Sequence, residues 1–431
     1  MDRHNIVANR ERPQGAAFRP ATLGPVEVRN RLIRAGTGES MADSAGRIGD
    51  DYAALHEELA RGGVGLAFTG HIFSHPRGRY GTLQAGLDSD AAIPGFRRVT
   101  DAVHRRGGRI FAQVAHAGSQ SMMFDTDPLS PSPVSNVMTG RPVRAACDDE
   151  IREAIAAFEQ AARRAMEAGF DGVHLHGANG YLISQFRSPL TNRRDDEWGG
   201  SQLHRDRFPL EIIRAVRAQI PSDRGFTMKV GLADLVDRSG GLEVRDSVPG
   251  IASFVAAGLD GVEVSSNLMS DYVSASIRGY IAVDRKRALQ DLLFHRLHRS
   301  AEPEGYFLPF AEAVRAAVDT NIILVGGLRR AETIDDVICS GRADFVSMAR
   351  PFIREPDLAR RLTDGRQPSA ACVSCNICLM HDEHHALKCW RTPRANLWEH
   401  ARYRLSGGFK GKGSGQKPSA AGRGGRDQPQ K

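Results

Sequence analysis

The chain has 431 residues, of which 41% are hydrophobic, and this is enough for one large folded domain or two ordinary ones. Its net charge is +7, but residues 401–431 hold eight basic residues and one acid, so the first 400 residues sum to zero. A neutral body argues against a nucleic-acid-binding surface, and the lack of any apolar run of about 18 residues argues against a membrane span.

The two ends of the chain give further expectations. Residues 1–15, MDRHNIVANRERPQG, are polar and contain no apolar stretch of the signal-peptide type, which predicts a cytoplasmic protein. Residues 403–431 are rich in Gly, Ser, Pro and Lys, a composition that predicts a disordered basic tail.

Short β-branched or apolar runs recur along the chain, and a helical pattern follows each of them. In chain order, the expected strands cover residues 31–35, 63–70, 109–116, 172–176, 226–231, 261–266, 321–327 and 345–350. The helical segments place apolar residues three and four positions apart, so each has one stripe to bury against a sheet. Eight βα units in this order predict an α/β fold of the TIM-barrel type over residues 17–370. The rival is a doubly wound open sheet, which usually has fewer units.

The lengths of the connections indicate where the functional end of this barrel lies. Segments from a helix to the next strand are short, whereas segments from a strand to the next helix are long at 117–147, 177–206 and 267–307. Active sites of TIM barrels form from the loops that follow the strands. We therefore expect His176, the last residue of the fourth strand, to point into that end of the barrel.

Two strand ends carry a pattern suited to phosphate. The seventh strand ends in VGGLRR and the eighth in SMARPF, at positions where TIM barrels often bind a phosphate group. Gly326 and Gly327 would let backbone N–H groups approach an anion, and Arg350 would supply a charged fork. Gln113 and Lys229, on the third and fifth strands, could pair with a ring that becomes anionic on reduction. Each alone could be an ordinary barrel residue; together with the phosphate pattern they indicate a phosphorylated, redox-active heterocycle.

The stretch FDGVHLHGANGYLISQFRSPLTNRRDDEWGGS resembles the old yellow enzyme family of FMN-dependent NADH:flavin oxidoreductases. The similarity extends from about residue 20 to 365 and includes RNRLIRAGTGE, RGGVGLAFTG, FAQVAHAG, ILVGGLR and ADFVSMARPFI. It implies the same eight-fold barrel, with FMN as cofactor and NAD(P)H as electron donor. The residues that would hold FMN are Gly326, Gly327, Ala349 and Arg350 at the phosphate, Gln113 at the pyrimidine edge, Lys229 near flavin N1, and Thr37 near N5 and O4.

The resemblance also gives roles to three polar residues that follow one another closely. The pair matching His176 and Asn179 donates hydrogen bonds to a substrate carbonyl or nitro oxygen, which becomes negative as reduced flavin passes hydride to the β-carbon of an activated alkene. Tyr181 matches the residue that protonates the α-carbon. Gly177 and Gly180 would allow the tight backbone that brings the three together. The implied activity is that of an ene reductase acting on a small molecule.

Three positions depart from the family pattern. His174 stands where Glu is common, Ser119 stands where Arg is frequent, and residues 35–39 read AGTGE rather than an Ala-Pro-Met-Thr type of sequence. A rival interpretation takes His174 and His176 as the His-x-His metal pair of amidohydrolases. That chemistry needs further His and Asp ligands, and none stands at the ends of the fifth, sixth or eighth strand.

A second segment, residues 371–400, contains four cysteines within CVSCNICLMHDEHHALKC. This spacing is typical of a [4Fe–4S] cluster or a four-thiolate zinc site, with unligated thiols as the alternative. The ligands would be Cys372, Cys375, Cys378 and Cys389. Three histidines of the segment could also bind metal or belong to a solvated loop: His381, His384 and His385.

The cysteine segment resembles that of the dienoyl-CoA reductase and trimethylamine dehydrogenase branch of the family. Those relatives carry a further FAD/NAD(P)H-binding region, whose Gly-x-Gly-x-x-Gly pattern does not follow here, and their last cysteine spacing is longer. Amine dehydrogenases also have Tyr and His at the positions of His176 and Asn179. Two functions stay open: an ene reductase with a relict or auxiliary cysteine site, and an FMN/iron–sulfur subunit that exchanges electrons with a separate reductase partner.

Substrate choice would depend on the loops 117–147 and 267–307. Their aromatic side chains could line the substrate pocket or serve only as loop packing: Tyr272, Tyr280, Tyr306 and Phe307.

Overall fold

The computed structural model describes residues 15–136, 139–236, 239–268 and 303–410. The chain divides into two compact units, the first with residues 1–281 and 299–388, the second with residues 282–298 and 389–431. Of the predicted tail, residues 411–431 lie outside the described residues, and its first residues are helical because α14 (Arg394–Leu405) extends to Leu405. Tyr272 and Tyr280 also lie outside the described residues.

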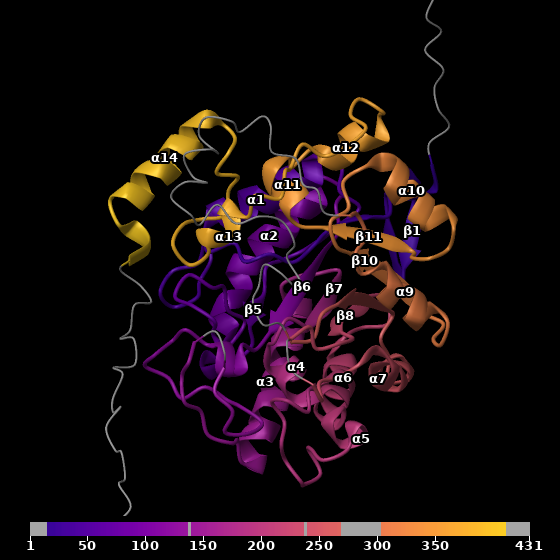
Figure 1. The fold of residues 1–431 in the computed structure, drawn as a ribbon. Helices are drawn as coiled ribbons and strands as arrows, with labels where there is room; N and C mark the ends of the chain where they lie inside the picture. The colour runs from indigo at the N-terminus through magenta and orange to yellow at the C-terminus, as the bar shows by residue number, and fades with distance from the viewer. Residues whose placement is uncertain (1–14, 137–138, 237–238, 269–302, 411–431) are drawn as a thin grey trace, which may run out of the picture. The chain divides into compact units, whose positions relative to one another are not determined.

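Eight parallel strands close into a barrel in the first unit, which confirms the predicted TIM barrel (Figure 1). The barrel closes because β4 pairs with both β3 and β6, and a ninth strand, β5 (Ile72–Phe73), adds to β6. The eight barrel strands are β3 (Leu32–Arg34), β4 (Leu66–Phe68), β6 (Ile110–Ala115), β7 (Gly172–Gly177), β8 (Gly225–Gly231), β9 (Gly261–Ser265), β10 (Asn321–Val325) and β11 (Phe345–Met348).

Helices alternate with these strands and lie around the outside of the barrel (Figure 1). Each expected helical segment forms a helix, and α3 shows the principle, since Ile151, Phe158 and Ala165 are buried along one of its faces. The expected helices are α1 (Asp50–Arg61), α2 (Ile93–Arg105), α3 (Asp148–Glu167), α6 (Arg207–Gln219), α7 (Val244–Ala256), α9 (Leu308–Arg315), α10 (Ala331–Cys339) and α12 (Leu358–Thr363).

Several short elements were not expected from the sequence, because they are too short for a periodic pattern. They are the strands β1 (Ala21–Leu23) and β2 (Val26–Val28), the helices α4 (Leu182–Arg187), α5 (Gln202–Arg205), α11 (Arg350–Arg354) and α13 (Ile377–Met380), and the 3-10 turns η1 (Ala16–Phe18), η2 (Pro76–Gly78), η3 (Asp90–Ala92), η4 (Gly118–Gln120) and η5 (Gly408–Lys410).

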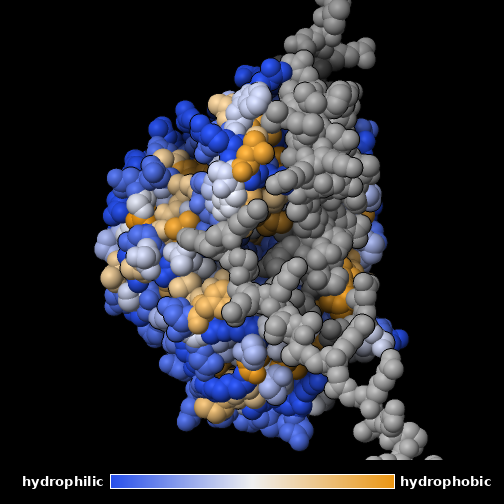
Figure 2. Space-filling view, turned by 60° about the vertical axis from the view of Figure 1, so that its left-hand side comes forward, coloured by the Kyte–Doolittle hydropathy of each residue, from blue (hydrophilic) through white to orange (hydrophobic). Residues whose placement is uncertain are grey.

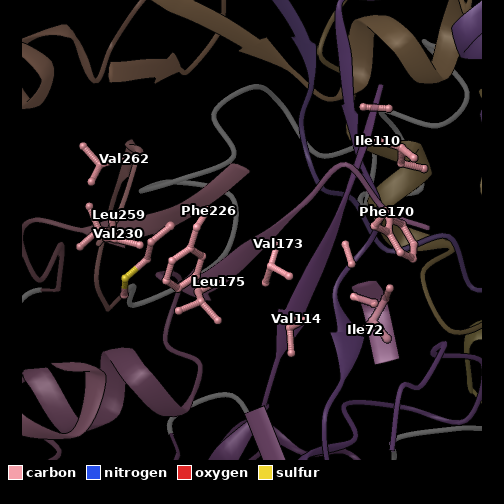
Figure 3. Close-up of a cluster of buried hydrophobic side chains, with 14 of the residues drawn as sticks. Ile72, Ile110, Val114, Phe170, Val173, Leu175, Phe226, Val230, Leu259 and Val262 are labelled. Atoms are coloured by element: carbon pink, nitrogen blue, oxygen red, sulfur yellow. The ribbon is translucent and has the colours of Figure 1, made fainter. Parts of the chain in front are cut away.

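Side chains alternate along each barrel strand between the helix layer and the barrel interior. On β7, Val173 and Leu175 join the apolar core that the helices cover, together with Phe226 of β8 (Figure 3). His174 and His176, at the intervening positions, therefore lie on the interior face of the same strand. The period of two thus directs the polar residues of the strands into the barrel.

The antiparallel hairpin β1–β2 packs an apolar layer against one end of the barrel interior. This end is the amino-terminal one, because Leu23 reaches Gly261, the first residue of β9. Phe111 fills the same layer where two glycines leave room: a Cβ at Gly172 or Gly225 would lie 2.7 or 2.3 Å from its ring. Polar chemistry is thereby left to the opposite end, where the strands lead into the long loops.

No helix within the described ranges is long and apolar enough to cross a bilayer. The described surface seen in Figure 2 is mostly hydrophilic, with apolar side chains in small separate patches.

Candidate active site

The end of β7 and the turn after it bring the predicted polar triplet together. The ring centroids of His176 and Tyr181 are 4.5 Å apart. Asn179 and Gly180 both adopt positive φ, at 60° and 78°, and this lets the chain reverse between the two rings. The turn is anchored on the residue that follows β9, because the Asn179 N–H donates to the Ser266 carbonyl oxygen at 3.0 Å. The Asn179 side-chain amide lies 3.4 Å from the Ser266 hydroxyl.

Two further rings, His71 and Tyr80, lie beside this triplet, and the sequence analysis missed them. The His71 ring is nearly parallel to that of His176, with 6.4 Å between centroids and 11° between planes. Its centroid is 5.5 Å from that of Tyr181, and Tyr80 lies 6.1 Å from Tyr181. The position of His71 at the end of the second predicted strand was the signal that could have identified it.

A buried charged network lies below the triplet in the barrel interior. Lys229 Nζ lies 2.8 Å from Glu263 Oε2, and His174 Nε2 lies 3.2 Å from the same oxygen. His174 also bonds to Thr227 at 2.8 Å and stacks on Phe68. Strand register explains the grouping, since Lys229 is paired with both His176 on β7 and Glu263 on β9. Lys229 was predicted from the sequence, whereas Glu263, which stands in an otherwise apolar strand, was not.

Burial and neighbouring charges set the protonation states in this network. Burial is the main cause that holds the pKa of His176 well below its usual value, and the Lys229 ammonium lowers this pKa further. His176 is therefore a neutral ring with one N–H donor. Burial alone would raise the pKa of Glu263, but Lys229 and His174 together hold it well below the usual range of a carboxyl. Glu263 is thus a carboxylate that balances the Lys229 ammonium.

Several buried histidines make the stability of the fold depend on pH. Burial, then His75 and Arg77, lowers the pKa of His116 to about 3, and burial is also the main cause of the lowered pKa of His174 and of His176. In the unfolded chain each histidine binds a proton below about pH 6.5, whereas the folded protein does not. Stability should therefore fall as the pH drops below 6.5, by up to about 1.4 kcal/mol per pH unit for each histidine.

The variant His116→Gln tests this assignment by thermal unfolding at pH 7.5, 6.5, 5.5 and 5. Its loss of stability between pH 6.5 and 5 should be smaller than that of the wild type. His204→Gln, at an exposed position on α5, is the matched control and should follow the wild-type curve. Equal slopes for His116→Gln and the wild type would exclude His116 as a source of the pH dependence.

Unsatisfied polar atoms in the barrel interior fit a bound heterocycle. Gln113 is 2% exposed, and within the described structure its Nε2 has no hydrogen-bond partner. Ser347 Oγ on β11 and His176 Nδ1 are in the same situation. Buried polar groups are nearly always paired, so these atoms point to a polar ligand. A Cβ at Gly36 would lie 2.3 Å from Gln113 Oε1, so the loop after β3 must pass close to this amide.

The same loop carries Thr37, the residue predicted near flavin N5 and O4. Thr37 is half-buried, and its hydroxyl donates to the Ala35 carbonyl oxygen at 3.1 Å. The loop is fixed by Glu39, which accepts from the Gly70 N–H at 2.7 Å and pairs with Arg34 at 3.0 Å. Glu39 and Arg34 are thus buried supports of the strand end, which no local sequence pattern had indicated.

The predicted phosphate residues lie where the neighbouring strands β10 and β11 end. Gly326 and Gly327 have φ of +125° and +74°. A Cβ built on either glycine would lie 3.0 Å from the Tyr306 ring, which therefore packs directly against this turn. Ala349 precedes α11, and Arg350 begins it. The Arg350 guanidinium donates to Asn376 Oδ1 at 2.6 Å.

An acidic side chain already occupies part of this end of the barrel. Glu304 Oε2 accepts from the backbone N–H groups of Arg329 and Arg330, at 3.0 and 3.1 Å. These donors stand directly before α10, where the helix dipole favours an anion. A phosphate at this strand end would therefore be bound by Gly326 and Gly327 and by the residues that follow β11.

The cysteine segment of the first unit packs on the loops after β3 and β4. Ser40 donates to Asp382 Oδ1 at 2.8 Å, the Leu83 N–H donates to Glu383 Oε2 at 2.7 Å, and the Leu387 N–H donates to the Glu39 carbonyl oxygen at 2.8 Å. Residues 371–388 thus contact the same end of the barrel as the polar triplet.

The predicted metal ligands fall in both units. Cys372, Cys375 and Cys378 belong to the first and Cys389 to the second, and all four are half-buried. In the part of the chain that the structure describes, no group of three or more His, Cys, Asp or Glu side chains is arranged to hold a metal ion. The metal site stays a prediction that rests on thiol spacing.

Several known oxidoreductases are similar to this chain over most of its length. The chain is 34% identical over 380 residues to the 4,4'-dithiodibutanoate disulfide reductase of Rhodococcus erythropolis, covering 85% of this chain and 93% of that protein. It is 33% identical to the NADH oxidase of Thermoanaerobacter brockii over 84% of this chain, and it spans only 52% of that protein's length. The solved old yellow enzyme homologue of Zymomonas mobilis matches with a TM-score of 0.66 and 25% identity, over 84% of this chain and 96% of that one.

A whole protein family also matches most of this chain. Residues 16–369 fit the NADH:flavin oxidoreductase / NADH oxidase family, a range that contains the complete barrel and all the strand-end residues described above. The chain therefore belongs to this family of the old yellow enzyme type and is an NAD(P)H:flavin oxidoreductase.

Proposed function

We propose that this protein is an FMN-dependent ene reductase, which uses electrons from NAD(P)H to reduce a C=C bond conjugated to a carbonyl or nitro group. The observation that carries the proposal is the grouping of His176, Asn179 and Tyr181 at the end of β7 and in the turn after it, together with Gln113, whose Nε2 has no partner among the described residues. Bound FMN would supply the two-electron chemistry.

The chain's own residues would stabilise charge and deliver a proton. His176 is buried and has a lowered pKa, so its ring stays neutral and keeps one N–H donor. With the Asn179 amide it would hold the substrate oxygen as that oxygen becomes negative, in a site that excludes water. The Tyr181 hydroxyl would donate the proton to the α-carbon. The hydrogen bond to Ser266 and the positive φ of Asn179 fix the turn that carries Asn179 and Tyr181.

The residues proposed to hold FMN come from five strand ends. Gln113 would pair with the pyrimidine edge, and Lys229 would face flavin N1. Thr37 would approach N5 and O4. The phosphate would lie against the backbone of Gly326 and Gly327 and be completed by two residues after β11: Ala349 and Arg350. Two observations support this arrangement: Gln113 Nε2 lacks a partner within the described structure, and both glycines have positive φ.

A second candidate is an FMN/iron–sulfur subunit that exchanges electrons with a separate reductase. Two observations favour keeping it: the bond from Arg350 to Asn376 ties the proposed phosphate site to the cysteine segment, and the NADH oxidase relative is nearly twice as long as the match. The described side chains do not form a metal site, so we derive no electron transfer through a cluster.

One preparation tests both candidates. Protein purified without oxygen should be yellow, release FMN on denaturation, and oxidise NADPH or NADH steadily when 2-cyclohexenone is added. Iron and labile sulfide at about four per chain, with turnover only when a reductase is added, would favour the second candidate. The 4,4'-dithiodibutanoate disulfide belongs in the same assay, because a relative is named for its reduction. If the protein reduces the disulfide but does not reduce the alkene, the proposal of an ene reductase is overturned.

A further inference from the structure

The imidazole of His71 is held in one tautomer by Gln84. The amide of Gln84 cannot be reversed, because its Oε1 accepts from the Tyr80 N–H at 2.6 Å and its Nε2 donates to the His71 carbonyl oxygen at 2.8 Å. The same Nε2 lies 2.7 Å from His71 Nδ1. Since that nitrogen faces a donor, it must accept, and the proton of the neutral ring is on Nε2.

The Nε2–H of His71 has no hydrogen-bond partner among the described residues. The residue is half-buried. A Cβ at Gly38 would lie 2.9 Å from Asp382 Oδ1 and 3.2 Å from His71 Nε2, so the loop that follows β3 passes directly beside this donor. Because Gly38 has no side chain, this residue leaves the space next to Nε2 unfilled.

His71 also has the right neighbours for contact with substrate. Its ring packs beside those of Tyr80 and Tyr181, with centroid distances of 5.7 and 5.5 Å. The ring of His71 is also nearly parallel to that of His176. With 6.4 Å between their centroids, the two imidazoles are too far apart to bond to each other directly. They are suited to two different oxygens of one small molecule.

We propose that His71 is a specificity-determining residue, whose Nε2–H binds a second acceptor oxygen of the substrate while His176 and Asn179 bind the first. The inference rests on the proposed function and narrows its substrate class. Alkenes that carry two oxygen acceptors, such as cyclic imides and ene-dicarbonyl compounds, are preferred over simple enones.

The test compares two five-membered rings, 2-methylmaleimide with two carbonyls and 2-methylcyclopent-2-enone with one. His71→Phe keeps an aromatic ring and removes the N–H, whereas His71→Asn keeps a donor. For His71→Phe we expect kcat/KM to fall by about tenfold with the imide, because one hydrogen bond is lost. With the enone, kcat/KM should change less than about twofold. His71→Asn should recover part of the loss, and His204→Phe, at an exposed position, should change neither.

Binding of the saturated analogues gives a readout that needs no turnover. Succinimide and cyclopentanone are titrated against the FMN-loaded protein while the flavin absorbance is followed. Only the Kd of succinimide should rise in His71→Phe. Equal changes for both ligands, or no change for either, would overturn the role of His71. If the wild type reduces neither alkene while the succinimide effect remains, the ene reductase fails and the donor role of His71 stands.

Discussion

His176→Ala and Asn179→Ala should each reduce the rate of alkene reduction by about 10²–10³. Each variant removes one donor to the oxygen that becomes negative during the reaction, and the remaining donor cannot compensate in a buried site. Because the two donors act on one atom, the double variant should be less impaired than the product of the single effects.

The measurement isolates the step in which the donors act. Protein reduced with dithionite is mixed with 2-cyclohexenone in a stopped-flow instrument, and the return of the oxidised flavin absorbance is recorded. Reoxidation by molecular oxygen serves as the internal control, since it forms no enolate and should change little in either variant. If both reoxidations slow equally, the loss lies in flavin binding, and the pair has no part in stabilising the substrate oxygen.

Replacing Glu263 with Ala should lower the free energy of unfolding by about 3–5 kcal/mol. The Lys229 ammonium would stay in the barrel interior without the carboxylate that lies 2.8 Å away, and His174 would lose the same partner. Both carboxylate and ammonium are nearly inaccessible to water, so solvent cannot replace the lost interaction. Thermal unfolding with and without added FMN should show a decrease of several degrees in Tm in both conditions.

An exposed ion pair provides the matched control. Glu243 lies 3.0 Å from Arg245 with both side chains exposed, and Glu243→Ala should change stability by less than about 1 kcal/mol. The double variant Glu263→Leu with Lys229→Met removes both charges and should regain much of the stability lost in Glu263→Ala. A Glu263→Ala protein as stable as Glu243→Ala would show that the buried pair is not structurally required.

The local parts of the site could be read from the sequence because their signals are contiguous. His176, Asn179 and Tyr181 lie within six residues at the end of a strand and in the turn after it, and positive φ at Gly180 is what a tight turn there requires. Gly326 and Gly327 likewise stand directly after a strand. Glu263 escaped prediction because its partners lie 34 and 89 residues away. Glu39 escaped because its contact with Gly70 spans 31 residues, and nothing in the neighbouring residues marks a buried carboxylate.

The order of strands and helices was determined by the sequence, since periods of two and of three to four residues decide which local structure can bury its apolar side. That order, with long loops after the strands, was sufficient for the barrel and its functional end. Tertiary structure alone decided which polar groups meet. Strand register brings Lys229 to Glu263, 34 residues away, and Glu263 to His174, 89 residues away. The contact with Gln84 likewise sets the tautomer of His71, because hydrogen-bond partners depend on positions in space.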